Sequence, residues 1–250
     1  MKHFIGTMNI IVTVHLLFAH ILYGSQEELL LKSEQHVVVV VEHNSSITGF
    51  LYCYSKPGAV WKKDGPAIPV VVGLNGVGKK CEGDRRAPQG IFRLSFAFGK
   101  ESVKPEWLHF PYRAMLKQSE CVDDADSPYY NKIVNPSEIS SGENWGSSEK
   151  MRRDLYHGDN TYKFGIMVEY NPWGKKDTST GKGAGSCIFL HIWRNGKTGT
   201  HGCTAMSEQN LIRLMEWLNS LAQPVLIQGT RNHLDNLRLK GKLHYELPKP

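Results

Sequence analysis

The 250-residue sequence has only five cysteines, and its 24 glycines and 12 prolines follow no period. The scarcity of cysteine excludes a small scaffold held mainly by disulfides, and the missing period excludes collagen. We find no internal repeat, no low-complexity tract and no linker long enough to separate two domains. After residue 24, no segment approaches the 18 consecutive apolar residues typical of a transmembrane helix. The excess of one charge is also small, +6 from 30 basic and 24 acidic side chains, and it selects no particular anionic partner.

What the sequence does contain is a series of short β-rich segments, and 40% of its residues are hydrophobic, enough for a sizeable core. Clusters of Gly, Pro, Asn and Ser separate these segments, which predict strands over 37–41, 50–54, 68–72, 91–94, 164–170, 187–193 and 225–228. Helices are predicted over 148–153 and over 207–222, where Ser207 can cap and Pro224 follows the end. Polar residues 231–250 are expected to form a tail. The predicted fold class is therefore mainly β with a few short helices.

Residues 1–24 differ from the rest of the chain because Lys2 is their only charged side chain apart from histidine. A short positive start followed by an apolar stretch is typical of a secretory signal peptide. The alternative is an uncleaved N-terminal anchor, which His15 and His20 make the poorer fit. Either interpretation predicts that the remaining chain is exported. In an oxidising compartment the five cysteines can form two disulfides, which leaves at least one thiol.

Several other features have less specific interpretations. Residues 73–80 approach a phosphate-binding loop, but Lys80 stands where a hydroxyl is required, so a β-turn is expected. Residues 123–126 lack the Gly and Glu spacing of a calcium loop, and a solvated turn is expected. Cys187, His191, His201 and Cys203 are residue types that bind zinc. If Cys187 and His191 lie on one strand they are about 13 Å apart, too far for one tetrahedral metal to bind both, so a zinc site is a minor alternative. Residues 100–162, rich in aromatics, are predicted to form either a binding loop or an aromatic satellite core.

The most informative arrangement combines His191, on the predicted strand 187–193, with Cys203, in a Gly-containing loop before the helix at 207–222. A thiol needs a base to become a thiolate near neutral pH, and a histidine within hydrogen-bond distance supplies one. The residues between the two make one tight reversal, so their side chains can meet. The N–H groups of Gly202 and Cys203 can stabilise a developing oxyanion. The pattern therefore predicts a cysteine nucleophile with a histidine base.

At these residues the chain resembles the YkuD-type L,D-transpeptidases, whose signature is a His, a spacer and Ser/Thr-His-Gly-Cys. Here the signature reads His191 and then Thr200-His201-Gly202-Cys203. The segments 83–92, 121–131, 147–151 and 183–191 are similar to a short-spacer branch of that family, and the similarity spans roughly residues 65–230. The spacer has eight residues, as in that branch, whereas Ala205 stands where the family often has Arg.

The resemblance implies a YkuD-like β-sandwich or barrel over residues 25–230 that acts on peptidoglycan stem peptides. It implies that Cys203 attacks the carbonyl before a terminal D-alanine, with His191 as base and then acid. An amine of a second stem peptide then accepts the acyl group. Gly202 and His201 would serve the oxyanion site, and Thr200, Ile192 and Trp193 would line the substrate cleft. The Ile192 carbonyl would also orient the imidazole.

The same resemblance implies no metal and no cofactor, because the thiolate supplies the nucleophile. It implies no nucleic-acid partner, a location in the bacterial periplasm or cell wall, and membrane attachment only through an uncleaved N-terminal segment. Alternatives remain open at this point. Water as the acceptor would give an L,D-carboxypeptidase or amidase, and other candidates are a non-catalytic wall-binding module or a thiol peptidase of another class.

Overall fold

The computed structural model describes residues 26–139, 144–176 and 182–248, so the predicted signal peptide or anchor over 1–24 lies outside the described residues. The strands are β1 (Gln35–Val41), β2 (Thr48–Ser55), β3 (Lys62–Val71), β4 (Gly90–Gly99), β5 (Tyr112–Ala114), β6 (Glu120–Val122), β7 (Ile133–Val134), β8 (Ser148–Lys150), β9 (Phe164–Val168), β10 (Phe189–Ile192), β11 (Thr204–Met206) and β12 (Val225–Thr230). The helices are α2 (Gln26–Lys32), α3 (Arg153–Tyr156), α4 (Glu208–Trp217) and α5 (Arg231–Leu239), with 3-10 turns η1 (Pro136–Glu138) and η2 (Ser220–Ala222). In this part of the chain no helix has the length and apolar character needed to cross a membrane.

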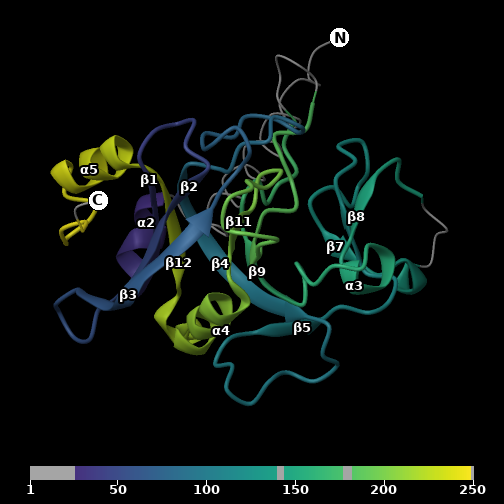
Figure 1. The fold of residues 1–250 in the computed structure, drawn as a ribbon, viewed down its shortest axis with the longest axis horizontal. Helices are drawn as coiled ribbons and strands as arrows, with labels where there is room; N and C mark the ends of the chain where they lie inside the picture. The colour runs from purple at the N-terminus through teal and green to yellow at the C-terminus, as the bar shows by residue number, and fades with distance from the viewer. Residues whose placement is uncertain (1–25, 140–143, 177–181, 249–250) are drawn as a thin grey trace, which may run out of the picture.

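Most strands belong to one sheet with the order β12-β1-β2-β3-β11-β10-β9-β4-β5. β12 also pairs with β4, which closes eight of the strands into a barrel and leaves β5 outside the ring. Figure 1 shows α4 and α5 packed around this barrel and the segments carrying β7, β8 and α3 grouped on the opposite side of the molecule. The predicted mainly β fold with a few short helices is therefore confirmed.

The run of valines in β1 is explained by burial on both faces of the strand. Val37, Val39 and Val41 point into the main core inside the barrel. Val38 and Val40 alternate with them and pack in a second cluster that includes Leu234 of α5. Because successive side chains of a strand face opposite sides, a strand covered on both sides has no position for a polar residue. The uninterrupted run of valines is thus explained by the position of β1 between two hydrophobic clusters.

Helix α4 begins where predicted and ends earlier than predicted. The Ser207 side chain accepts a hydrogen bond from the Asn210 N–H, as an N-cap does. Leu211, Leu214 and Met215 are buried against the main core. The helix ends at Trp217 instead of continuing to residue 222, and Leu221, expected on its apolar face, lies in η2 with 87% of its surface exposed.

Two predicted segments are wrong. Residues 148–153 do not form a helix, because 148–150 form β8, which pairs antiparallel with β6 and places Lys150 in an ion pair with Glu120. Residues 231–248 are not a polar tail. Thr230 caps α5, and the side chains of Leu234, Leu243 and Leu247 are buried in the second core cluster.

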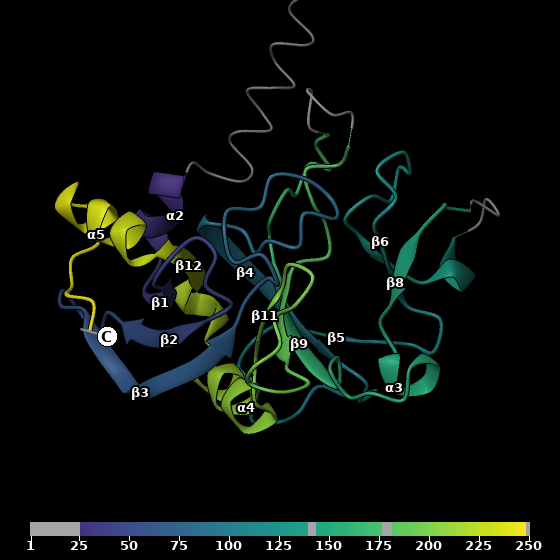
Figure 2. The same cartoon turned by 45° about the horizontal axis from the view of Figure 1, so that its top comes forward.

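A second sheet, with the order β7-β6-β8, stands beside the barrel (Figure 2). It occupies the middle stretch, residues 100–162, for which a binding loop and an aromatic core were the open alternatives. A disulfide between Cys121 of β6 and Cys187, just before β10, connects this sheet to the barrel. The connection is close to the predicted nucleophile, so the position of the second sheet bears directly on the site.

Candidate active site

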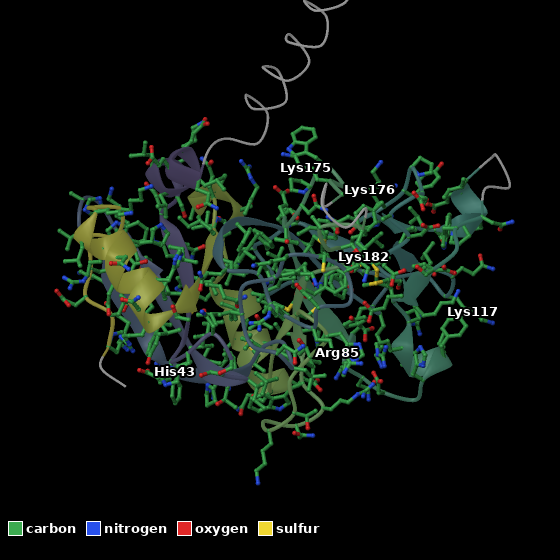
Figure 3. The ribbon with its side chains drawn as sticks, turned by 90° about the horizontal axis from the view of Figure 1, so that it is seen from above. His43, Arg85, Lys117, Lys175, Lys176 and Lys182 are labelled. Atoms are coloured by element: carbon green, nitrogen blue, oxygen red, sulfur yellow. A yellow bond between two sulfur atoms is a disulfide. The ribbon has the colours of Figure 1, made fainter. Side chains whose placement is uncertain are left out.

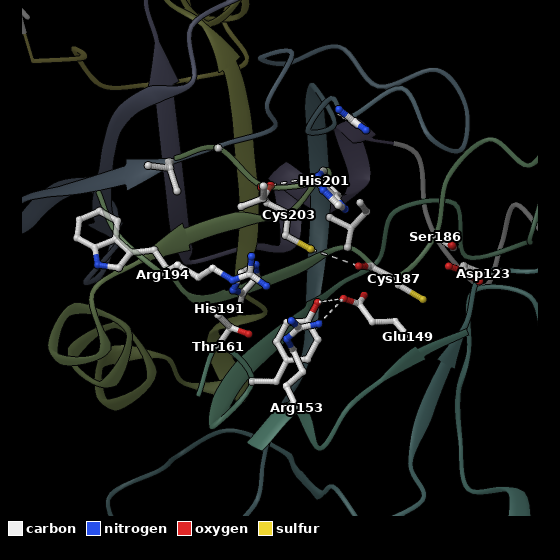
Figure 4. Close-up of a pocket in the computed structure, with 18 of the residues that line it drawn as sticks. Asp123, Glu149, Arg153, Thr161, Ser186, Cys187, His191, Arg194, His201 and Cys203 are labelled. Atoms are coloured by element: carbon white, nitrogen blue, oxygen red, sulfur yellow. Dashed lines mark hydrogen bonds and ion pairs between the residues drawn. The ribbon is translucent and has the colours of Figure 1, made fainter. Parts of the chain in front are cut away.

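The predicted base lies on β10, and the predicted nucleophile directly precedes β11, the parallel neighbour of β10 in the barrel. In the pairing of β10 with β11, His191 lies opposite Ala205. Cys203 is two residues before Ala205, and alternation along a strand directs it to the same face as His191. Figure 4 shows both side chains facing the same pocket.

A cavity of about 780 Å³ lies over this face. One wall comes from the loop around Lys79–Arg85, and another comes from the second sheet and α3, which contribute Glu149 and Arg153 among others. Figure 3 shows Arg85 in the middle of the molecule, between the barrel and the second sheet. Of the residues predicted for the site, the cavity is lined by Cys203, His191, Gly202, His201, Thr200 and Trp193. Ile192 instead packs its side chain into the main core.

Cys203 has a free, buried thiol. Its Sγ donates to the carbonyl of Cys187 at 3.3 Å and accepts the Phe189 N–H at 3.3 Å. Burial raises the pKa of this thiol to about 12. Within the described residues no hydrogen bond joins Sγ to the His191 ring. The resting site therefore holds a neutral thiol whose proton is directed at a backbone carbonyl.

The His191 imidazole is fixed in one tautomer. Its Nδ1 lies 2.8 Å from the Ile192 carbonyl, and a carbonyl can only accept, so Nδ1 carries the proton and Nε2 carries the lone pair. The edge-to-face contact with Tyr162, at 5.2 Å between ring centroids, restricts the ring further. Burial lowers the pKa of His191 to about 4. The imidazole is thus neutral at neutral pH, with its Nε2 unprotonated.

Thr200 organises the loop that carries the nucleophile. Its Oγ1 donates to the Cys203 carbonyl at 2.6 Å and accepts the Gly202 N–H at 3.1 Å. The Gly202 N–H that we expected to face an oxyanion is therefore already occupied. The Thr200 backbone forms hydrogen bonds with Val72 and Leu74. The β-turn predicted within residues 73–80 lies next to it, and in this turn the Gly76 N–H donates to the Gly73 carbonyl.

A polar network behind His191 was not predicted from the sequence. Tyr162 donates its hydroxyl to Glu149 at 2.7 Å, and the Arg153 guanidinium lies over the Tyr162 ring and pairs with Asp159 at 2.6 Å. Burial raises the pKa of the Glu149 carboxyl. The segment 147–151 gave a signal through its similarity to the family branch, but its helical interpretation concealed that Glu149 faces the site. Tyr162 and Asp159 belong to no motif.

The cysteine pairing takes Cys187 out of the zinc alternative. Of the two disulfides that the sequence allows, the structure has one, Cys121–Cys187, while Cys53, Cys81 and Cys203 are free. Cys187 therefore has no thiolate to offer a metal. Across residues 26–139, 144–176 and 182–248 no three His, Cys, Asp or Glu side chains are placed to hold a metal ion, and the stretch 123–126 includes a turn in which Asp126 N–H donates to Asp124.

Comparison with known proteins identifies the family. A family model described as the L,D-transpeptidase catalytic domain, YkuD, matches residues 32–231. No curated protein matches the chain. The chain is similar to the crystal structure of the helical cell shape determining protein Pgp2 from Campylobacter jejuni, with 15% identity and a TM-score of 0.42 over 82% of this chain and 55% of that one. A mutant of Pgp2 gives 14% identity and a TM-score of 0.39 with the same coverage, so the chain spans about half the length of these structures. Because the family model matches far more than half of the sequence, the protein belongs to the YkuD family of L,D-transpeptidase catalytic domains.

Proposed function

We propose that the protein is a cysteine L,D-transpeptidase that acts on peptidoglycan stem peptides. The observation that carries the proposal is the placement of a buried thiol, Cys203, and a neutral imidazole with a free lone pair, His191, on one cavity in a chain of this family. A thiol with a pKa near 12 is a weak nucleophile until a base accepts its proton during attack.

The proposed reaction has two acyl-transfer steps. Cys203 Sγ attacks the carbonyl before the terminal D-alanine while its proton passes to His191 Nε2. The tetrahedral intermediate then breaks its C–N bond, and Nε2 returns the proton to the leaving amine of D-alanine. The resulting thioester is attacked by an amine of a second stem peptide, which loses its proton to Nε2, and the proton finally returns to Sγ.

The resting contacts define what must change for this reaction. The Sγ proton is directed at the Cys187 carbonyl and has to turn towards Nε2 of His191, which lines the same cavity. Since the Gly202 N–H is held by Thr200, we assign the Cys203 N–H to the oxyanion. Thr200 is then a loop-supporting residue, and Ile192 acts through its carbonyl and not as a substrate contact.

The charges lining the cavity suit a peptide rich in carboxylates. Five basic side chains line it against three acidic ones, and Arg85 among them has a guanidinium group, which binds carboxylates through paired hydrogen bonds. The Cys121–Cys187 disulfide supports an exported protein, because such bonds persist in oxidising compartments. We therefore place the protein in the periplasm or cell wall, delivered by the N-terminal segment either as a cleaved signal peptide or as an anchor.

The test is incubation of the purified protein with tetrapeptide muropeptides, with the products identified by mass. Transpeptidation gives dimers that have lost one alanine. Tripeptides alone would replace the proposal with the hydrolytic alternative, and unchanged muropeptides would favour a non-catalytic module. The Cys203→Ala variant is expected to lower turnover by about 10³-fold or more. Cys81→Ala, which removes another free thiol, is the control and should retain wild-type activity.

A further inference from the structure

A lysine that the mechanism above does not use is buried beside the nucleophile loop. The side chain of Lys79 is only 2% exposed, and its Nζ pairs with Asp84 at 3.0 Å and donates to the Cys81 carbonyl at 3.2 Å. Removing an ammonium from water is costly even when it is paired. A surface ion pair could hold the same loop at a lower cost, so the burial itself requires an explanation.

Two glycines make room for this lysine. A Cβ added to Gly185 would lie 2.2 Å from Lys79 Cε, and a Cβ added to Gly202 would lie 3.5 Å from Nζ. Both glycines have a φ that side-chain-bearing residues rarely adopt, +123° and +150°. The ammonium therefore lies beside Gly202, the residue that precedes Cys203.

Asp84, the partner of Lys79, directs its carboxylate at backbone groups of its own loop. Asp84 accepts the N–H groups of Lys80 at 2.7 Å, Cys81 at 3.2 Å and Arg86 at 3.0 Å in addition to the lysine. The backbone N–H groups of Lys80 and Arg86, together with Lys79, hold the pKa of the Asp84 carboxyl below its usual value, against the effect of burial. The negative end of the ion pair is anchored within residues 80–86.

The charges acting on the thiol differ in sign. Glu149, across the cavity, raises the pKa of Cys203, whereas Lys79 and the Phe189 N–H lower it. Tyr162 packs edge-to-face against His191, and Asp84, the partner of Lys79, accepts its hydrogen bonds from residues 79–86. Lys79 is thus the cation that opposes both burial and Glu149.

We infer that Lys79 is a positioning residue for the nucleophile, whose buried ammonium beside Gly202 stabilises negative charge on Cys203 Sγ. The inference deepens the proposed function, and for turnover it rests on that function. The competing explanation is that Lys79 only fastens the loop over residues 79–84. In that case its shape and hydrogen bonds matter and its charge does not.

The first experiment measures alkylation of Cys203 by iodoacetamide between pH 7 and 9, with the modified peptide quantified by mass. Lys79→Met, which keeps the length of the side chain, is expected to slow alkylation about tenfold at each pH. Lys79→Arg, which keeps the charge, should stay closer to wild type than the methionine variant does. Lys80→Met, the same charge loss at the exposed neighbouring position, is the matched control and should change the rate less than twofold.

Opposite outcomes overturn the inference. Alkylation at the wild-type rate in Lys79→Met, or an equal loss in Lys80→Met, would show that the buried charge does not act on the thiol. A methionine variant that reacts faster than the arginine variant would favour the loop-fastening role. If Lys79→Met unfolds, the double variant Lys79→Met/Asp84→Asn leaves no unpaired carboxylate, and it should show the same tenfold slower alkylation.

Alkylation needs no substrate, which separates this inference from the proposed function. If the wild-type protein leaves muropeptides unchanged but Lys79→Met slows alkylation, the function fails and the role of Lys79 stands. If muropeptide dimers form and Lys79→Met alkylates normally, the reverse holds. Where both stand, Lys79→Met should lower kcat at least about tenfold and leave KM nearly unchanged, since Lys79 acts on the thiol and not on substrate binding.

Discussion

A single hydroxyl holds the backbone around the nucleophile. Thr200 Oγ1 is bonded on both sides, to the Gly202 N–H and to the Cys203 carbonyl. Its own backbone is bonded to Val72 and Leu74 of the neighbouring turn. Thr200 therefore connects the backbone around the nucleophile to the neighbouring turn.

The Thr200→Val variant keeps the shape of this side chain and removes both hydrogen bonds. Leaving partly buried backbone groups unpaired is expected to lower the free energy of unfolding by about 1–3 kcal/mol and to reduce kcat/KM by at least tenfold. Urea unfolding and muropeptide turnover measure the two effects. Thr200→Ser retains the hydroxyl and should stay within about threefold of wild type. Full activity in the valine variant would show that the loop holds its shape without this residue.

The motif residues could be predicted from the sequence because they lie close together in it. His191, Thr200 and Cys203 span a short segment with recognisable chemistry. Lys79 and Tyr162 could not be predicted, since only the closed barrel brings them to that segment. The direction of the thiol was also beyond the sequence, because it depends on the Cys187 carbonyl, whose residue has a φ of +54° and is held by a disulfide to β6.

At the level of elements, the sequence pattern predicted the right strand or helix where the local preference agreed with the contacts made in the folded protein. The valine run of β1 and the capped start of α4 are explained by burial and by Ser207. Residues 148–150 have a helix-like sequence but form a strand, because they pair antiparallel with β6 and Lys150 forms an ion pair with Glu120. The polar composition of residues 231–248 concealed a few widely spaced leucines, and those few are enough to dock α5 and the residues after it.

Two leucines of α5 provide a matched test of this docking. Leu234 is fully buried in the second core cluster, and Leu239 is 74% exposed at the end of the same helix. Leu234→Ala is expected to lower the free energy of unfolding by about 2–5 kcal/mol, because it removes buried methyl groups and leaves a cavity. Leu239→Ala should change it by less than about 0.5 kcal/mol. Equal small effects in urea unfolding would mean that this segment behaves as the tail first expected.

For the whole molecule, β1 separates two of the buried clusters, and these two have different roles. One lies inside the ring and supports the strands that carry the active site. The other lies between the outer face of β1 and α5, and it buries His36 against Trp61 at 3.9 Å between ring centroids. His36 Nδ1 is 2.8 Å from the Tyr245 hydroxyl, while its buried Nε2 has no hydrogen-bond partner among the residues that the structure describes. Protonation of the His36 imidazole in this second cluster is therefore energetically unfavourable.

Two buried histidines, His36 beside the second cluster and His191 at the active-site cavity, are kept neutral, which makes the fold sensitive to acid. Burial lowers the pKa of His36 to about 3 and of His191 to about 4, from an ordinary value of 6.5. Below pH 6.5 the unfolded chain takes up protons at these residues while the folded protein does not, so stability falls as the pH decreases towards the folded values. Glu149 and Glu169, whose pKa values burial raises, act in the opposite direction.

A variant at His36 isolates one of these contributions. Between pH 6.5 and pH 5, a histidine that stays neutral in the folded state destabilises the protein by about 2 kcal/mol. His36→Gln cannot titrate, so its free energy of unfolding should fall by about 2 kcal/mol less than that of wild type over this range, whatever its stability at pH 7. His43→Gln, at an exposed position, is the control and should retain the wild-type dependence. Parallel curves for wild type and His36→Gln in urea unfolding at the two pH values would show that His36 gains its proton without unfolding, and that the second cluster admits charge.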